Sequence, residues 1–436
     1  MANIVSIKCA LRPSRIKTRR LEITTIDPTS ITAGNNAVTV RCRIEGRNGF
    51  WLLKCYFRPK PHLRDIYCEA YYPKELRTFS INGIEEYVDV VALPWVEGKP
   101  LDWHIGRPGT DYAALSRSFD KMALNLLESS FAHGDIKPDN IIVCQHNVMV
   151  LVDHDAEWRP EFDFVEPTEM GTLAYRHPRR DASYFNKHID DYPIALISTA
   201  LAALALDTEA MIQHIKPDKS LFLPDRCIAK RDKALEIAKQ ILLEHRDAPH
   251  YRIACCLHSP TPSLPSLRDY IYYAANPYKQ EVPEWSSSYY SNGFWGYLWN
   301  DEWIIPPLYE SCWAIHHGVA EVTLGETRFE LPVVSSPRPR KKSRTWEDLI
   351  PVRDPKPQPK PNPRMAKQIK KPREGNLDNH GKLWSDEEEE LMAIYLFDEC
   401  RLSMIAQLLG RTEKAVVARI HKLKLPITKR NRRKRP

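Results

Sequence analysis

Four polar residues in one part of the sequence have the types and spacing that phosphoryl transfer requires. They lie in HGDIKPDN, residues 133–140, and in LVDHDAE shortly after it. Transfer from ATP needs a carboxylate to orient the attacking hydroxyl, an amide and a second carboxylate to hold magnesium, and a lysine for the phosphates. The carboxylate that orients the hydroxyl can be Asp135, and the phosphate-binding lysine can be Lys137. The magnesium ligands can be the amide of Asn140 and the carboxylate of Asp153. The alternative is a polar loop between a helix and a hairpin, but the joint spacing favours the chemical interpretation.

A second lysine is predicted inside a strand. Lys54 lies among apolar residues in FWLLKCYF, where a lysine either extends along the sheet surface or binds an anion. An acid could hold Lys54 against the nucleotide phosphates. The helical pattern at 64–79 offers Glu69 and Glu75, and Glu75 is the better candidate. The segment before the strand holds one glycine, Gly34, whereas a phosphate-cradling loop usually needs several.

The elements that must position these residues follow from hydrophobic periodicity and turn residues. Asn48-Gly49 indicates a hairpin. Pro94-Trp95 forms a connector against which an adenine would pack. The predicted elements are strands at 38–44, 50–57 and 88–93, helices at 64–79 and 112–130, and a buried helix at 194–206.

Residues 30–280 resemble the protein kinase superfamily. HGDIKPDN is similar to its catalytic loop, VMVLVDHD to its magnesium motif, MGTLAYRHP to the end of its activation segment, and HIDDYPIAL to the start of its large helix. The resemblance implies an α+β, bilobal kinase-like fold with ATP and Mg²⁺ as cofactors. The implied roles are substrate positioning by Asp135, γ-phosphate contact by Lys137, magnesium binding by Asn140 and Asp153, a bridge from Thr172 to Asp135 and Lys137, and a buried acid at Asp190.

The residues near Asp135 favour a protein substrate. Lys137, two residues after the aspartate, and the GTxxY motif at Thr172 are similar to serine/threonine protein kinases. Small-molecule kinases of the aminoglycoside phosphotransferase kind share HGD but usually have another residue at the position of Lys137. A small-molecule kinase is therefore the third hypothesis.

Several departures from the kinase pattern keep a second hypothesis open. Gly134 stands where many regulated kinases have an arginine, so control by a phosphorylated loop is not expected. His154-Asp155 replaces the usual Phe-Gly and adds an acid that could bind metal. Arg179 replaces a glutamate that forms a structural ion pair. With the single Gly34, these departures leave a pseudokinase scaffold, acting through DNA or protein binding, as the alternative.

Residues 284–333 resemble a WG-type repeat. Aromatic and β-branched residues separated by Gly and Pro are typical of short strands. One such unit buries little surface, so it is expected to pack on the kinase-like body or to recruit a partner. Its four tryptophans are expected in its core: Trp295, Trp299, Trp303 and Trp313.

A small helical module is predicted near the C-terminus. Ser385 and Thr412 have the types and positions of helix N-caps, and three helices are predicted. The module resembles Myb-like helix-turn-helix domains, whose last helix fits the major groove of DNA. The expected core is Trp384, Leu391, Ile405, Leu408, Val416, Ile420 and Leu423, and the expected DNA contacts are Lys414, Arg419, His421 and Lys422. An acidic run at 386–390 would repel DNA, so a protein-interaction module is the alternative.

Charge is distributed unevenly along the chain. Residues 336–373 contain thirteen Lys or Arg and three acidic residues. Residues 424–436 contain seven Lys or Arg and no acidic residue, whereas the net charge of the whole chain is only +7. The rest of the chain is therefore net acidic. The basic stretches favour a polyanionic partner, with a solvated disordered linker as the alternative.

Cysteine usage and hydropathy favour the cytoplasm. Ten cysteines without CxxC spacing argue against a zinc site or a disulfide framework and fit a reducing compartment. The N-terminus has no signal-peptide pattern, and the longest apolar run is too short for a membrane span. The expected partners are a protein substrate and double-stranded DNA, without a membrane. The predicted organisation is a kinase-like domain at 1–283, a WG-type repeat at 284–333, a disordered basic linker at 334–380, a helix-turn-helix at 381–425 and a basic tail at 426–436.

Overall fold

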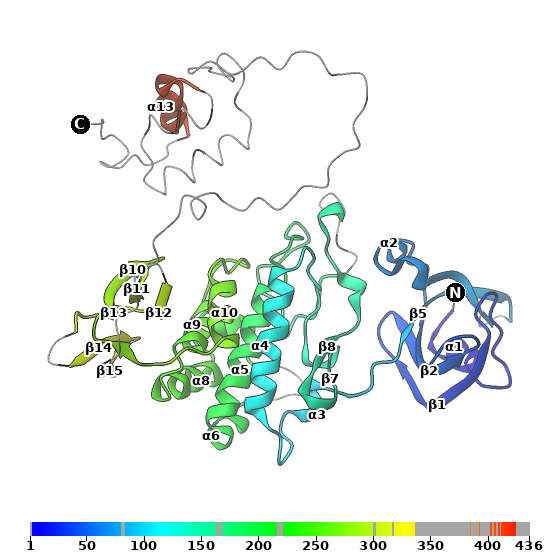
Figure 1. The fold of residues 1–436 in the computed structure, drawn as a ribbon. Coiled ribbons are helices and arrows are strands. Elements are labelled where there is room, and N and C mark those ends of the chain that lie inside the picture. Colours follow the sequence, from blue (N-terminus) through cyan, green and yellow to red (C-terminus); the bar gives the residue numbers. More distant parts are fainter. Residues whose placement is uncertain are drawn as a thin grey trace. The chain divides into compact units, whose positions relative to one another are not determined.

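The structure is a computed structural model, and its described part falls into two compact units. It describes residues 2–79, 83–162, 167, 169–215, 221–299, 302–315, 318–335 and 411–423, with Trp384, Met392, Leu402, Ile405, Ala406 and Leu409. The units are Met1–Ser343 and Arg344–Pro436. Helices and sheets are mixed in the first unit, as expected for an α+β chain (Figure 1). The disorder expected for the linker concerns residues that lie almost entirely outside the described part.

The N-terminal part is a five-stranded antiparallel sheet with a short helix on one face. Its strand order is β1-β2-β3-β5-β4. Alternate residues of the central strands are buried in one apolar cluster with the helix α1. The elements are α1 Ile4–Ala10, β1 Ile23–Ala33, β2 Ala37–Ile44, β3 Trp51–Tyr56, β4 Tyr71–Phe79 and β5 Glu85–Pro94. The strands predicted at 38–44, 50–57 and 88–93 are confirmed as β2, β3 and β5.

The helix predicted over residues 64–79 is wrong for most of its length. The chain forms the short helix α2, Leu63–Tyr67, then a 3-10 turn, and then β4. Cys68 ends the helix with a φ of 48°. Leu76 and Thr78 are buried in β4, which pairs with β5, so tertiary strand pairing overrides the local helical pattern.

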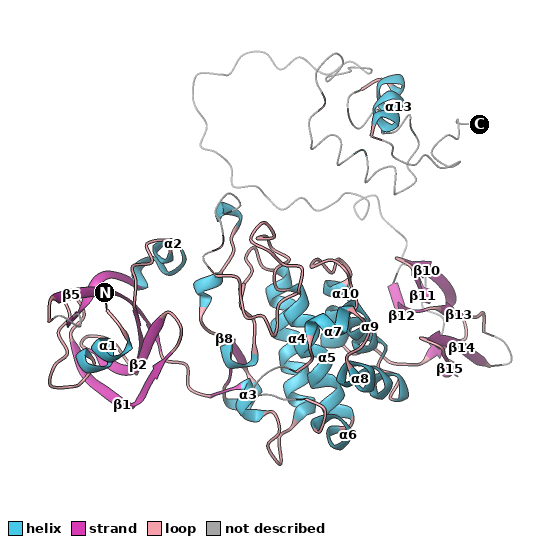
Figure 2. Ribbon diagram, turned by 180° about the vertical axis from the view of Figure 1, so that it is seen from behind, coloured by secondary structure: helices cyan, strands magenta, loops and turns pink. Residues whose placement is uncertain are grey.

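A group of helices forms the core of the following part. The helix α5 is buried along nearly its whole length, and the amphipathic helix α4 packs on it (Figure 2). These two elements confirm the helices predicted at 112–130 and 194–206. The helices are α3 Leu101–His104, α4 Tyr112–Glu128, α5 Asp191–Leu206, α6 Thr208–Ile212, α7 Pro224–Ile228, α8 Lys233–Glu244, α9 Ala248–Cys256 and α10 Leu267–Ala275.

A small sheet brings two functional loops together. It consists of β6 Lys99–Pro100, β7 Ile141–Val143 and β8 Met149–Leu151. Because β7 and β8 are antiparallel, the residues before β7 lie beside those after β8. Asn140 and Val152 are joined directly, since the Val152 N–H donates to the Asn140 carbonyl oxygen at 2.9 Å.

The residues expected to form a WG-type repeat fold into strands that share a core with the helices. Tyr297 and Tyr309 are buried in the same apolar cluster as α9 and α10. Arg252 of α9 is buried and pairs with Glu310 at 2.7 Å. The expected tryptophan core is wrong, because Trp313 is 56% exposed and the other three tryptophans are only half-buried. The strands are β9 Val282–Pro283, β10 Ser287–Ser291, β11 Phe294–Trp299, β12 Glu302–Tyr309, β13 Ser311–Cys312, β14 Val319–Leu324 and β15 Thr327–Val334.

In the second unit, the described residues include one complete helix. The helix α13, Glu413–Lys422, begins as predicted at Thr412, whose side chain accepts the Ala415 N–H at 3.2 Å. Its buried residues Val416 and Ile420 belong to an apolar cluster with Met392, Leu402, Ile405, Ala406 and Leu409, and with Trp384, Val417 and Leu423 at its edge. The predicted core residues Leu391 and Leu408, and the predicted cap Ser385, lie outside the described residues.

Candidate active site

The HGDIKPDN loop is fixed by a buried acid at the start of α5. Asp190 accepts hydrogen bonds from the backbone N–H groups of His133 and Gly134, the second at 2.9 Å. Burial raises the pKa of Asp190 to about 6. Burial also lowers the pKa of His133 to about 4, and the ring Nε2 lies 3.0 Å from the Val152 carbonyl oxygen. The neutral imidazole can therefore donate to the chain at the end of β8.

The backbone conformation at position 134 requires glycine. Its φ is +84°, and a Cβ built on it would lie 2.0 Å from the carbonyl oxygen of Ala156. An arginine at this position, as many regulated kinases have, would require the loop and the Ala156 turn to separate.

The Asp135 carboxylate is surrounded by three of the predicted site residues. Its Oδ1 accepts the Thr172 backbone N–H at 2.6 Å. Its Oδ2 lies 3.3 Å from the Asn140 Nδ2 and 3.2 Å from the Lys137 Nζ. Lys137 also donates to the Thr172 hydroxyl at 3.3 Å. Two donors and one cation thus fix the direction of the carboxylate, and the predicted contacts of Thr172 with Asp135 and Lys137 are present.

Asn140 and Asp153 offer oxygen ligands on neighbouring segments. Asn140 uses its Nδ2 to reach Asp135, so its Oδ1 is the atom that could bind a cation. Asp153 follows β8 with a φ of 68°, and its side chain is 43% exposed. Amide and carboxylate oxygens suit Mg²⁺, which commonly takes one or two protein ligands and completes its shell with phosphates and water. Among the described residues no group of three or more His, Cys, Asp or Glu could hold a metal ion.

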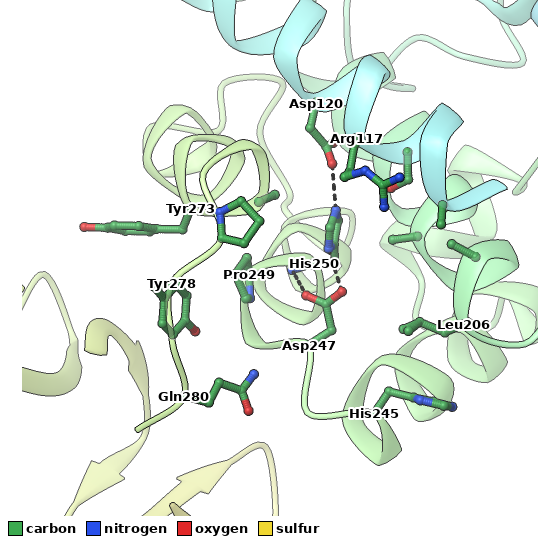
Figure 3. Close-up of a pocket in the computed structure, with 16 residues that line it drawn as sticks. Arg117, Asp120, Leu206, His245, Asp247, Pro249, His250, Tyr273, Tyr278 and Gln280 are labelled. Carbon is green, nitrogen blue, oxygen red and sulfur yellow. Dashed lines mark hydrogen bonds and ion pairs between the residues drawn. The ribbon is translucent and has the colours of Figure 1, made fainter. Parts of the chain in front are cut away.

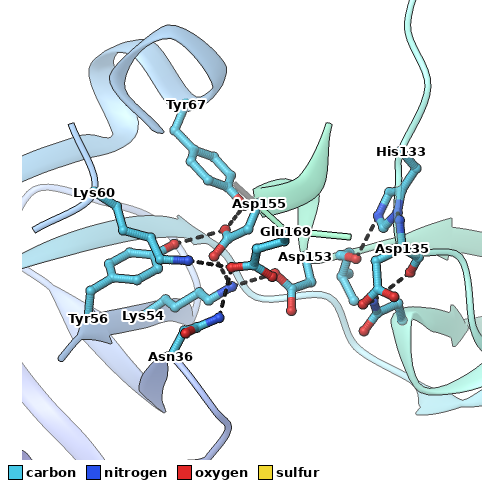
Figure 4. Close-up of polar contacts among 12 residues, drawn as sticks. Asn36, Lys54, Tyr56, Lys60, Tyr67, His133, Asp135, Asp153, Asp155 and Glu169 are labelled. Carbon is cyan, nitrogen blue, oxygen red and sulfur yellow. Dashed lines mark hydrogen bonds and ion pairs between the residues drawn. The ribbon is translucent and has the colours of Figure 1, made fainter. Parts of the chain in front are cut away.

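Lys54 points from β3 toward two carboxylates. Its Nζ pairs with Asp153, and it lies 2.8 Å from the Asp155 Oδ2 (Figure 4). Burial lowers the pKa of Lys54, but Asp153 and Asp155 outweigh this effect and hold the pKa above its usual value. Lys54 is therefore a fixed positive charge at the site.

The predicted pairing of Lys54 with Glu75 does not occur. Glu75 is fully buried in β4, where its Oε1 accepts the backbone N–H groups of Arg19, Arg20 and Leu21 at 3.0, 2.7 and 2.7 Å. Its Oε2 pairs with the Arg20 Nε at 3.1 Å. Because this segment is a strand and not a helix, Glu75 fastens the N-terminal segment to the sheet and has no nucleotide role in this geometry.

Glu169 is a further polar contact that the sequence did not indicate. It pairs with Lys60, and its Oε1 accepts the Asn36 Nδ2 at 2.8 Å (Figure 4). Asn36 lies in the turn between β1 and β2, whereas Glu169 comes shortly before Thr172. No local sequence signal links positions more than one hundred residues apart, so only the folded chain reveals this contact.

Three of the four expected DNA-contact residues are exposed on α13. These are Lys414, His421 and Lys422. Arg419 is half-buried, and its guanidinium lies 5.9 Å from the centre of the Trp384 ring. The two exposed lysines lie near opposite ends of the helix, and the exposed acid Glu413 lies next to Lys414.

Comparison with known proteins identifies no family for this chain. The chain matches no protein-family model and no curated protein sequence. Within the described residues, no helix is long and apolar enough to cross a membrane.

A second ionisable cluster lies in a different cavity of about 330 Å³ between α4, α5, α9 and α10 (Figure 3). His250 lies between two carboxylates, with Nε2 3.0 Å from Asp120 and Nδ1 2.8 Å from Asp247. Ser198 donates to Asp120 at 2.7 Å. Burial lowers the pKa of His250, but the two carboxylates outweigh it and raise the pKa well above the usual value. The imidazolium joins α4 to α9 and has no contact with Asp135.

We expect His250→Gln to destabilise the protein by about 3 kcal/mol near pH 6, because it leaves the buried Asp120 and the partly buried Asp247 without their cation. The folded-state pKa of His250 is raised, so its contribution is complete below the unfolded pKa of about 6.5 and is lost as pH rises through the folded value. Urea unfolding from pH 5.5 to 9.5 should therefore show a shrinking difference between wild type and variant. His245→Gln, at an exposed residue of the same cavity, is the control and should change little. A difference independent of pH would contradict this role.

Proposed function

We propose that the chain is an ATP- and Mg²⁺-dependent phosphotransferase with a bilobal, protein kinase-like arrangement. The observation that carries the proposal is the Asp135 carboxylate, oriented by Thr172, Asn140 and Lys137 within one loop system. The pairing of Lys54 with Asp153 supports it, because a sheet residue reaches the segment that follows β8.

Each residue would act through the position that the fold gives it. Asp135 would accept a hydrogen bond from the attacking hydroxyl and hold it in line with the γ-phosphate. Lys137, 23% exposed beside Asp135, would neutralise charge on the transferring group. Lys54 would contact the remaining phosphates. Asn140 and Asp153 would hold Mg²⁺, which neutralises phosphate charge when bound.

The proposed acceptor is a serine or threonine hydroxyl of a protein. The contact of Lys137 with both Asp135 and Thr172 supports this class, because it places a cation and a backbone segment at the acceptor side of the carboxylate. A small-molecule acceptor remains the third hypothesis, as the residue pattern around Lys137 favours it less.

Asp135→Asn should reduce phosphate transfer at least about 100-fold, since the amide cannot accept the hydroxyl proton. The measurement is incorporation of label from γ-labelled ATP into a generic protein acceptor in the presence of Mg²⁺. Asp139→Asn, at an exposed acid of the same loop, is the matched control and should retain transfer. Equal incorporation by wild type and Asp135→Asn would refute the assignment.

A pseudokinase scaffold is the second candidate function. It is favoured by the turn between β1 and β2, where Gly34 is the only glycine and has an ordinary negative or extended φ. A phosphate-cradling loop normally brings several backbone N–H groups toward the oxygens. In this function, the exposed basic residues of α13 would carry the activity by binding double-stranded DNA.

Removal of residues 381–436 should abolish salt-sensitive binding to duplex DNA. Lys422→Ala in the full chain should lower the slope of log affinity against log salt by about 1, because one phosphate contact is lost. Fluorescence anisotropy at several salt concentrations measures both effects. Glu413→Gln removes an exposed acid from the same helix and should not weaken binding. Unchanged binding by the truncated chain would exclude the module as the DNA-binding part.

A further inference from the structure

Asp155 is a carboxylate beside the proposed site with three side-chain partners. It is 3% exposed. Its Oδ1 accepts the hydroxyls of Tyr56 at 2.9 Å and Tyr67 at 2.8 Å, and its Oδ2 lies 2.8 Å from the Lys54 Nζ (Figure 4). Both oxygens are therefore occupied by donors from the sheet and from α2, and a cation bound in their place would have to break this network.

The neighbouring carboxylate differs in exposure. The Asp153 side chain is 43% exposed, whereas the Asp155 side chain is 4% exposed. Lys54 is the side-chain partner that the structure gives to Asp153. Asp153 can therefore exchange Lys54 for another cation at low cost, whereas Asp155 cannot.

The helix that supplies Tyr67 is itself fastened to the segment after Asp155. Arg159 donates to the carbonyl oxygens of Asp65 and Ile66, each at 3.1 Å, and its Nε pairs with Glu157 at 2.5 Å. The helix α2 is thus held against the chain that carries the two aspartates, and Tyr67 is presented in a fixed position.

We propose that Asp155 is a positioning residue that holds Lys54 in the site, while Asp153 is left to bind the metal. Asp155 therefore forms the ion pair with Lys54 that the sequence analysis predicted for Glu75. The helix α2 contributes the Tyr67 hydroxyl, which donates to Asp155. The catalytic importance of the Lys54–Asp155 ion pair rests on the proposed phosphotransferase function. The pair itself is a property of the folded chain and can be tested without turnover.

The first test measures how accessible the Lys54 amine is without nucleotide. Amine-reactive labelling at one fixed pH is followed by mass spectrometry of the Lys54 peptide. Asp155→Asn removes the buried ion-pair partner 2.8 Å from the Lys54 Nζ, so labelling should rise several-fold. Asp155→Glu should restore most of the protection. Glu69→Gln, at an exposed carboxylate first considered for this role, should leave labelling unchanged. If Asp155→Asn labels like wild type, the proposal is wrong.

The second test separates the positioning role from a general loss of folding. Tyr67→Phe keeps the charge of Asp155 and removes one donor, so Lys54 should stay protected while the KM for ATP rises several-fold and kcat changes less. The control is Tyr87→Phe, at a tyrosine of β5 that is not among the partners of Asp155. If Tyr67→Phe changes kcat and KM as little as this control, the part of the proposal that concerns α2 is refuted. If wild type shows no ATP turnover but Asp155→Asn exposes Lys54 to labelling, the phosphotransferase function fails and the Lys54 pair stands.

Discussion

The charge of Lys54 between Asp153 and Asp155 is the interaction on which the site depends. The Lys54 side chain is only 12% exposed, and a buried ammonium is unfavourable unless carboxylates compensate it. Those carboxylates come from the segment after β8, so the sheet part and the helical part are joined at the proposed nucleotide site. Glu169, through Lys60 and Asn36, adds a second polar link between the same two parts.

Local spacing predicted the loop around Asp135 well, because its residues are close in sequence and its geometry is set by a tight turn. Asp135, Lys137 and Asn140 meet within six residues of chain, and Thr172 was found from its own short motif. Lys54 in a strand was also predicted from apolar alternation. Whether these residues transfer phosphate stays a prediction.

Contacts across long stretches of chain could not be predicted. The residue pattern at 64–79 predicted a helix, but β4 forms because it pairs with β5. In this strand Glu75 contacts the N-terminal segment and not Lys54. The two tyrosine partners of Asp155 are 99 and 88 residues away in sequence. The tryptophans of residues 284–333 are large and apolar, but Tyr297 and Tyr309 are the aromatic residues buried in the cluster that also contains residues of α9.

Asp153 is the partner of Lys54 and the proposed ligand of Mg²⁺. Calorimetric titration of ATP into wild type and Asp153→Asn, with and without Mg²⁺, tests this double role most directly. If the proposed site binds nucleotide, Mg²⁺ should tighten ATP binding at least about tenfold in wild type, or 1.4 kcal/mol, and have little effect in the variant. An equal response to Mg²⁺ in both proteins, or ATP binding in neither, would contradict the central claim.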